Sequence, residues 1–183
     1  MGQSVAASNF CVLDIETCRG DFDNYNPADF MLLVTGTMDQ VRYVPYECNK
    51  QDLGNLADFL NSYSGTIVTF NGTRFDFAVL DVYFKKFLGS APKMKKHYDI
   101  MAKFQYLAGF RVKLDTLCSE TLGISKIPWD HTQNEGVFAK QKHRLLEYNE
   151  QDLTITSRLY QRILAGQPLI VDNKRYFLPK PLP

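Results

Sequence analysis

The sequence predicts an α/β protein: a mixed five-stranded sheet with helices on both faces. Two observations carry this prediction, a cluster of three strand-like runs and the helix–strand–helix succession that follows it. The three apolar runs are 9–15 (NFCVLDI), 30–37 (FMLLVTGT) and 41–46 (VRYVPY), with a polar turn around Asp39 and Gln40 between the last two. Strands this close in sequence favour an antiparallel meander.

The next three elements predict a crossover connection. Residues 51–62 space their leucines and a phenylalanine at helical intervals, which indicates an amphipathic helix. Residues 66–70 (TIVTF) are β-branched and bounded by turn residues, which is typical of a buried strand, and a second helix at 75–88 ends at Gly89. Because a helix that joins two strands of one sheet usually makes them parallel, the predicted sheet is mixed.

The rest of the chain predicts one more strand and mainly helices. A short strand or turn at 98–100 follows the lysine-rich segment KMKKH. Helices are expected at about 101–107, 114–122 and 138–165, with a break in the last one near Tyr148.

These elements define three parts of the chain. We expect a flexible N-terminus at 1–8, one domain at 9–166 and a C-terminal extension at 167–183. In the extension, Asp172 and Asn173 are turn residues between two short apolar runs, which favours a hairpin, with the start of a truncated element as the alternative.

Composition limits which classes of protein and which cellular environments fit this chain. A hydrophobic fraction of 45% fits a globular chain, and a net charge of +1 means that nucleic acid would have to bind to a local patch. The four cysteines contain no CxxC pair, so reduced thiols are favoured over zinc or disulfides. There is no apolar run of membrane-spanning length and no signal-peptide pattern. A soluble, cytoplasmic protein without membrane contact is therefore the expectation.

Four acidic residues and a tyrosine are the most informative feature. Asp14 and Glu16 lie two apart on a predicted strand and so share a face, Asp76 falls in the first turn of a helix, and Tyr148 and Asp152 lie one helical turn apart. Each pattern alone has an ordinary explanation: a strand end in solvent, a favourable helix dipole, an exposed polar face. Converging carboxylates, however, repel one another unless hard divalent cations lie between them.

Three segments together resemble the DEDD, or DnaQ-like, superfamily of 3′→5′ exonucleases. Residues 14–17 (DIET) resemble its first motif, residues 71–80 (NGTRFDFAVL) its second, and residues 148–152 (YNEQD) its third in the tyrosine form. The histidine form would place histidine where Glu147 stands. The resemblance covers residues 9–165, is closest to the proofreading domains of family B polymerases and their stand-alone relatives, and implies a ribonuclease H-like fold.

The resemblance implies a role for each of these residues. Asp14 would bridge two divalent cations, Mg²⁺ or Mn²⁺, with Glu16 and Asp152 completing one site. Asp76 would hold the other cation, largely through water, and Tyr148 would orient the attacking water. A carboxylate-bound metal pair of this kind supports in-line cleavage of a phosphodiester.

Substrate contacts are implied next to the same motifs. Glu16 and the backbone near Thr17 would contact the terminal 3′-hydroxyl, and Asn71 and Phe75 are further substrate-binding candidates. For Asn71 the alternative is a residue that only holds a turn, and for nearby Asp99 a helix N-cap or a salt bridge is the preferred interpretation. The expected substrate is the 3′ end of single-stranded DNA or RNA, with DNA favoured, and the expected products are nucleoside 5′-monophosphates.

The dense basic segment from Lys85 to Lys113 is the candidate for the strand track. Lys93, Lys95 and Lys96 are its candidate phosphate contacts, and aromatic residues are interleaved with the basic ones. Cations and aromatics together suit single strands. The alternative is a solvated surface above core aromatics.

Two questions stay open from the sequence. Trp129 and His131 fall in a segment expected to border the cleft, without an assigned role. The competing function is a catalytically silent nucleic-acid-binding or scaffold module of the same fold within a larger polymerase or repair protein.

Overall fold

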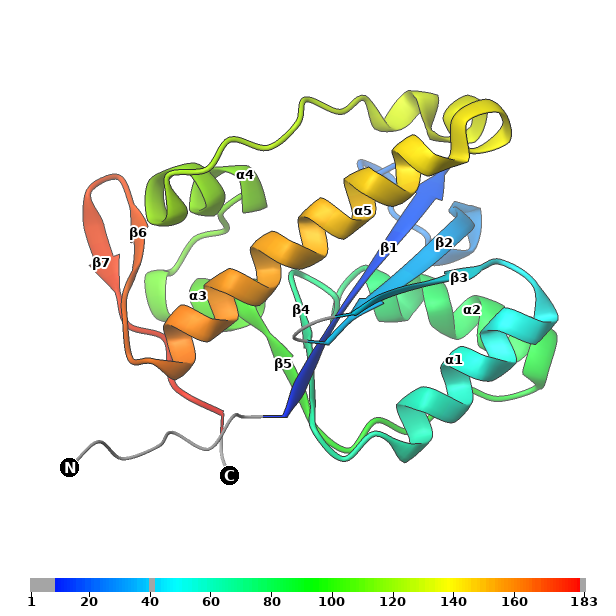
Figure 1. Cartoon of the computed structure of the whole chain (residues 1–183), viewed down its shortest axis with the longest axis horizontal. Coiled ribbons are helices and arrows are strands. Elements are labelled where there is room, and N and C mark those ends of the chain that lie inside the picture. The colour runs from blue at the N-terminus through cyan, green and yellow to red at the C-terminus, as the bar shows by residue number, and fades with distance from the viewer. Residues whose placement is uncertain (1–8, 40–41, 182–183) are drawn as a thin grey trace.

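The computed structural model describes residues 9–39 and 42–181; the expectations for residues 1–8 and for the turn at Gln40 lie outside them. Its centre is a five-stranded mixed sheet of order β3–β2–β1–β4–β5 (Figure 1). β1, β2 and β3 form the predicted antiparallel meander, and β4 and β5 run parallel to β1. The strands are β1 (Phe10–Cys18), β2 (Met31–Met38), β3 (Tyr43–Glu47), β4 (Thr66–Thr69) and β5 (His97–Asp99).

Helices cover both faces of the sheet, as the sequence predicts. α5 crosses one face diagonally, and α1 and α2 lie on the other (Figure 1). Short 3-10 turns at Pro27–Asp29 and His131–Gln133 and a π-helical turn at Cys118–Leu122 complete the regular structure. The helices are α1 (Lys50–Ser62), α2 (Asp76–Leu88), α3 (Ile100–Ala108), α4 (Leu114–Leu117) and α5 (Asn134–Leu164).

Side-chain alternation along β1 divides the core into two layers. Phe10 and Val12 pack in the cluster that contains the C-terminal half of α5, whereas Leu13 and Ile15 pack against α1 and α2. Because side chains two apart on a strand share a face, Asp14 continues the row of Phe10 and Val12. The α5 side of β1 therefore changes from apolar to acidic as the strand proceeds.

α5 presents an inward row that brings polar groups to this acidic end. Leu145, Tyr148, Asn149 and Asp152 are all buried and follow helical spacing. The predicted break near Tyr148 is wrong, because the non-helical residue inside α5 is Gln141, with φ −143° and ψ 47°. The helix stays regular where its inward row meets the sheet, which keeps Tyr148 and Asp152 on one surface.

The C-terminal segment forms an antiparallel pair, β6 (Leu169–Val171) and β7 (Lys174–Tyr176). Asp172 and Asn173 join the strands with φ values of 51° and 59°, the left-handed conformation that a two-residue hairpin turn requires. Leu178 and the ends of β6 are buried in the same core as α5. The division of the chain at residue 166 stays a prediction.

Two further findings concern the setting of the protein. Among the described residues, no helix combines the length and the apolar character needed to span a membrane. The four cysteines are free thiols, and three of them are buried.

Candidate active site

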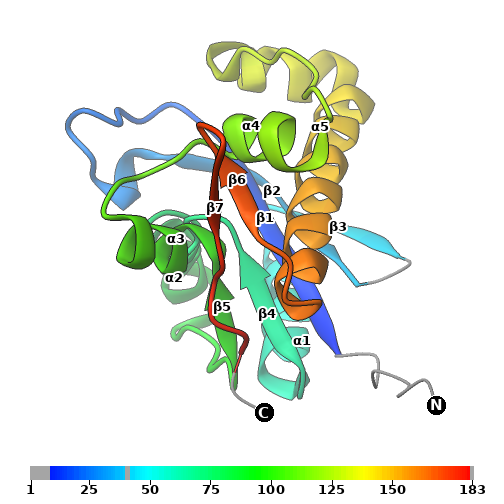
Figure 2. The same cartoon turned by 90° about the vertical axis from the view of Figure 1, so that its left-hand side faces the viewer.

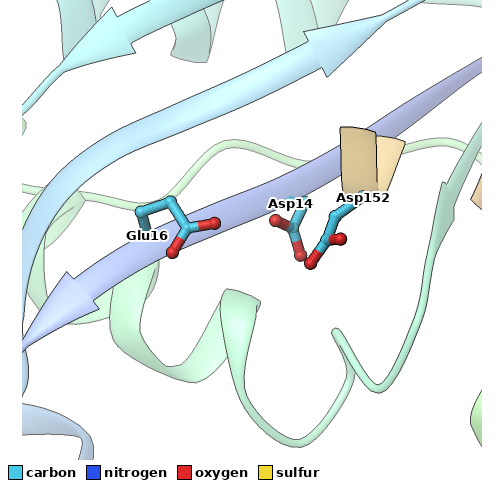
Figure 3. A group of neighbouring side chains, drawn as sticks. All are labelled: Asp14, Glu16 and Asp152. Carbon is cyan, nitrogen blue, oxygen red and sulfur yellow. The ribbon is translucent and has the colours of Figure 1, made fainter. Parts of the chain in front are cut away.

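Three carboxylates meet between β1 and α5. Asp14 and Glu16 extend from the α5 side of β1, and Asp152 reaches them from α5 (Figure 3). One oxygen from each lies within 4.8 Å of the others. The strand and helix that carry them are packed rigidly by the core, so the three groups are held at a spacing that a cation can bridge.

Asp76 adds a fourth carboxylate beside this group. β4 pairs with β1 only as far as Val12, so the edge of β1 beyond that point is open. There the backbone N–H of Ile15 donates to Asp76 Oδ1 at 3.2 Å. Asp76 is 3% exposed and lies close enough to Asp14 to raise its pKa.

Ionising all four carboxylates together is energetically unfavourable. Burial, followed by the charges of Asp76, Glu16 and Asp152, raises the pKa of Asp14 well above its usual value. Burial and the Asp152 charge do the same to the pKa of Glu16. Burial raises the pKa of Asp152, against the opposing charge of Lys126, and raises the pKa of Asp76 to about 7. Positive charge placed among them would therefore be bound favourably at neutral pH.

A lysine already supplies part of that charge. Lys126 Nζ donates to Asp152 Oδ2 at 2.8 Å and to the Tyr148 hydroxyl oxygen at 3.0 Å, and it lies 3.4 Å from the exposed carboxylate of Asp115. Burial alone would lower the pKa of Lys126, but Asp152 and the two hydrogen bonds outweigh it, so the pKa is raised and the lysine stays charged. One monovalent cation leaves most of the cluster's negative charge uncompensated.

Two fully buried asparagines fix the carboxylates of β1. Asn149 Nδ2 donates to Asp14 Oδ2 at 2.9 Å, and the hydroxyl of Tyr43 donates to Asn149 Oδ1 at 3.1 Å. Asn134 Nδ2 donates to the carbonyl of Thr17 at 2.8 Å and reaches Glu16 Oε2 at 3.4 Å. Both asparagines are 0% exposed, so they have no water to compete for these bonds.

The close approach of Asn149 also explains a glycine in β2. Gly36 is the strand partner of Asp14. A Cβ at Gly36 would lie 1.9 Å from Asn149 Oδ1, so a larger residue would push α5 away from the site.

Tyr148 is clamped by the segment that carries Lys126. Trp129 stacks on its ring with centroids 4.5 Å apart, and His131 meets its edge at 5.7 Å. The Trp129 indole N–H donates to Asn134 Oδ1 at 2.6 Å. Trp129 thus connects the orientation of Tyr148 to that of Asn134, the residue that supports Glu16.

A cavity of about 530 Å³ opens beside this clamp. It is lined by Lys126, Trp129, His131 and Tyr148 on one side and by acidic residues of α4 and the π-helical turn on the other. Solvent and a polar ligand can therefore reach Tyr148 from outside.

The sequence-predicted substrate residues lie in several places. Thr17 follows Glu16 on β1 and is half-buried. Asn71 has φ 68°, donates its backbone N–H to Asp99 Oδ1 at 2.9 Å and accepts from Arg111 Nη2 at 2.7 Å. Phe75 packs half-buried against Phe30, with ring centroids 5.1 Å apart.

Asp99 is the N-cap of α3, as the sequence predicts. Its side chain accepts from the backbone N–H of Ala102 at 3.1 Å, and it also accepts from the N–H groups of Asn71 and Thr73 at 2.9 Å. One carboxylate therefore fixes the loop that leads into the helix of Asp76.

The three lysines proposed as phosphate contacts are not brought to the carboxylates. Lys93, Lys95 and Lys96 precede β5, at the amino ends of the parallel strands, whereas the carboxylates lie toward the carboxyl ends. His97 pairs with Ile67 of β4, which pairs with Cys11 of β1, so Lys96 is level with the residue before Cys11. Asp14 therefore lies about four residues, or roughly 13 Å, farther along the strand direction. A contact to more distant phosphates stays a prediction.

Comparison with known proteins adds no family. A scan of the chain against models of protein families finds no match, and a search of curated protein sequences finds none either. Geometry and the sequence motifs therefore carry the functional argument.

Proposed function

We propose that this protein is a metal-dependent 3′→5′ exonuclease that removes nucleoside 5′-monophosphates from single-stranded nucleic acid. The observation that carries the proposal is the meeting of Asp14, Glu16 and Asp152 within 4.8 Å, with Asp76 bound to the adjacent backbone. These residues come from three separate segments, and the same residues resemble the exonuclease motifs. A ribonuclease H-like fold is part of the proposal, and the mixed sheet with β1 at its centre and helices on both faces supports it.

The donor set fits two divalent cations, Mg²⁺ or Mn²⁺. All four donors are carboxylates, the ligand type that hard cations prefer. Asp152 Oδ1 is buried and accepts no hydrogen bond from the described residues, although Lys126 Nζ lies 2.8 Å away outside bonding geometry. Asp14, Glu16 and Asp152 would hold one cation and Asp14 and Asp76 the other. Bound there, the cations would acidify the attacking water and stabilise the leaving 3′ oxygen.

Tyr148 acts as a positioning hydroxyl and not as a base. Burial and the Asp152 charge raise its pKa, so the phenol keeps its proton at neutral pH. Lys126 Nζ donates to the hydroxyl oxygen, and the hydroxyl is also hydrogen-bonded to Asp152, so Tyr148 would orient a water together with that metal ligand. The same lysine holds Asp152, so tyrosine and metal ligand are fixed relative to each other.

The proposed substrate is a single strand with a free 3′ end, and DNA is preferred to RNA. Glu16 and Thr17 would contact the terminal 3′-hydroxyl, with Asn71 and Phe75 near the last nucleotides. We also propose a cytoplasmic setting, because free thiols persist in a reducing compartment.

One observation favours a second candidate, a catalytically silent nucleic-acid-binding module. Lys126 already neutralises part of the charge on Asp152 without a metal. In a silent module this ion pair would replace the metal, whereas in the enzyme it would coexist with bound cations.

Incubation of a 5′-labelled single strand with the protein and Mg²⁺, Mn²⁺ or a chelator distinguishes the two. The exonuclease gives a descending ladder that needs metal and is blocked by a 3′-phosphate. Strand binding without a ladder in either metal would support the silent module, and cuts in a circular strand would show an endonuclease.

A further inference from the structure

One exposed surface, formed by residues 103–113 and 174–180, has no part in the carboxylate site. We call it the α3–tail surface. The hairpin of β6 and β7 lies alongside α3 and α4 (Figure 2). The two segments are joined through the ring of Tyr176, whose centroid lies 4.9 Å from that of Phe104 and 6.2 Å from that of Phe110. The surface is therefore a fixed part of the fold.

Apolar side chains are unusually exposed here. Tyr106 is 92%, Leu107 48%, Phe110 40% and Phe177 60% exposed. These four are the majority of the six large apolar side chains that are exposed in the described part of the chain. Aromatic rings that stand in solvent are available for stacking.

The charge of the surface is of one sign. Its two segments contain six basic residues and no aspartate or glutamate. None of the six forms an ion pair with a described residue. In a chain whose net charge is only +1, this is a local concentration of unpaired positive charge. The basic residues are Lys103, Arg111, Lys113, Lys174, Arg175 and Lys180.

One basic residue from each segment borders a shared cavity. Lys103 and Lys180 line one cavity of about 400 Å³, together with Lys96. The hydroxyl of Tyr98 donates to the carbonyl of Pro179 at 2.7 Å and fixes the tail against β5. Lys96, one of the sequence-predicted phosphate contacts, therefore borders this surface.

The surface reaches the edge of the candidate active site through Arg111. The guanidinium donates to Asn71 Oδ1 at 2.7 Å, and the loop that begins at Asn71 leads into α2 at Asp76. A chain lying on the surface could thus continue toward the carboxylates.

We propose that the α3–tail surface binds single-stranded nucleic acid, carrying the part of the strand upstream of its 3′ end. The inference rests on the proposed function for the direction of the strand. Unpaired cations match the phosphates, and exposed aromatic rings match unstacked bases, a combination that suits single strands and not duplexes. The hairpin would then serve as one wall of the strand path.

The test is equilibrium binding of a 5′-fluorescein single strand of 15 nucleotides in chelator, followed by anisotropy at several salt concentrations. Changing Lys103, Lys174 and Arg175 to Gln should weaken binding and reduce the salt slope by about 2, at about 0.7 for each lost phosphate contact. The matched control changes three exposed basic residues elsewhere that form no ion pair with a described residue, Lys50, Lys140 and Arg144, to Gln and should leave the slope nearly unchanged.

A second variant tests stacking. Tyr106→Ala should weaken single-strand binding by about tenfold if one base stacks there, with little effect on a duplex of equal length. Because Tyr106 is 92% exposed, its loss should not affect folding, which the thermal midpoint checks.

Equal affinity and salt slope in the basic variant and the wild type would overturn the proposal, as would an equal loss in the control. A change in self-association alone, measured by sedimentation, would assign the surface to a second copy of the chain and also overturn it. The assay needs no cleavage, so it separates this proposal from the exonuclease: strand binding without a metal-dependent ladder would sink only the latter.

Discussion

The carboxylate site and the α3–tail surface are both charged, but they present their charges in opposite ways. At the site, Glu16, Asp76 and Asp152 are residues at most 7% exposed, and each carboxylate has a fixed partner or neighbour. On the surface, basic side chains stand in solvent and form no ion pair with any residue that the structure describes. Chemistry requires groups held in place, and holding a flexible strand requires groups that can reach it. Changes at the site should therefore alter rate and stability, and changes on the surface should alter affinity.

The largest expected effect follows from Asp14→Ala. Asp14 lies at the centre of the cluster, so its loss should lower cleavage by more than the roughly 10–100-fold that loss of a supporting group costs. The metal-free protein should also melt at a higher temperature, because like charges are relieved. Cleavage rates and thermal midpoints measure both, with Asp58→Ala on the exposed face of α1 as the control. Full activity of Asp14→Ala in pure Mg²⁺ would contradict the assignment.

Tyr148→Phe should have the second-largest effect. It keeps the ring that stacks on Trp129 and removes the hydroxyl that Lys126 binds. Turnover should fall by about 10²–10⁴-fold, the usual contribution of a group that acts on a proton or a water. Mn²⁺ affinity should stay close to that of the wild type in calorimetry. An unchanged rate would reduce Tyr148 to a packing residue.

Trp129→Phe tests whether Trp129 contributes to cleavage or only to the stability of the fold. The stack on Tyr148 is retained, but Asn134 Oδ1 loses its donor. A buried acceptor left unsatisfied costs about 1–3 kcal/mol of stability, and loosening of Glu16 should slow cleavage by about 10-fold. Urea unfolding and single-turnover rates measure the two effects. Loss of stability with an unchanged rate would show that Trp129 supports the fold alone.

The smallest effect on cleavage is expected from a property of the unchanged, metal-free protein, the pH dependence of its stability. Burial raises the pKa of Asp76 from 3.8 to about 7, so the folded chain holds a proton that the unfolded chain releases. The folded state then binds more protons between about pH 4 and pH 7, and its stability should fall as the pH rises through this window. The fall should be on the order of a few kcal/mol.

Urea midpoints at pH 5 and pH 8 in chelator measure this fall. Asp76→Asn should reduce the slope, and Mg²⁺ should restore stability at pH 8 by binding the ionised carboxylates. If stability in chelator rises with pH instead, burial does not raise the pKa of these carboxylates in the folded protein.

Much of the fold follows from local patterns, while part of the site does not. Alternation along β1 predicts that Asp14 and Glu16 share a face, and helical spacing predicts that Tyr148 and Asp152 are neighbours on one surface; the structure has both arrangements. Asn149, three residues before Asp152, shares that inward spacing, so the same pattern could have found it.

Lys126 and Trp129 could not be found in this way. Both lie in an irregular segment without periodicity, and their contacts join positions 22 and 5 residues apart in the chain. Likewise, the basic run before β5 is dense in sequence, but the topology puts it at the amino ends of the parallel strands. A run of basic residues that is dense in sequence can therefore lie far from the carboxylate site, and the distance between them follows only from the fold.

Anomalous diffraction from crystals soaked in Mn²⁺ with a single strand tests the central claim most directly, with Asp14→Ala carried through the same soak as the control. The account predicts two manganese peaks, one among the carboxylate oxygens of Asp14, Glu16 and Asp152 and one between Asp14 and Asp76, with neither at full height in the variant. No peak at the cluster, with Lys126 still bound to Asp152 and the strand in place, would contradict it.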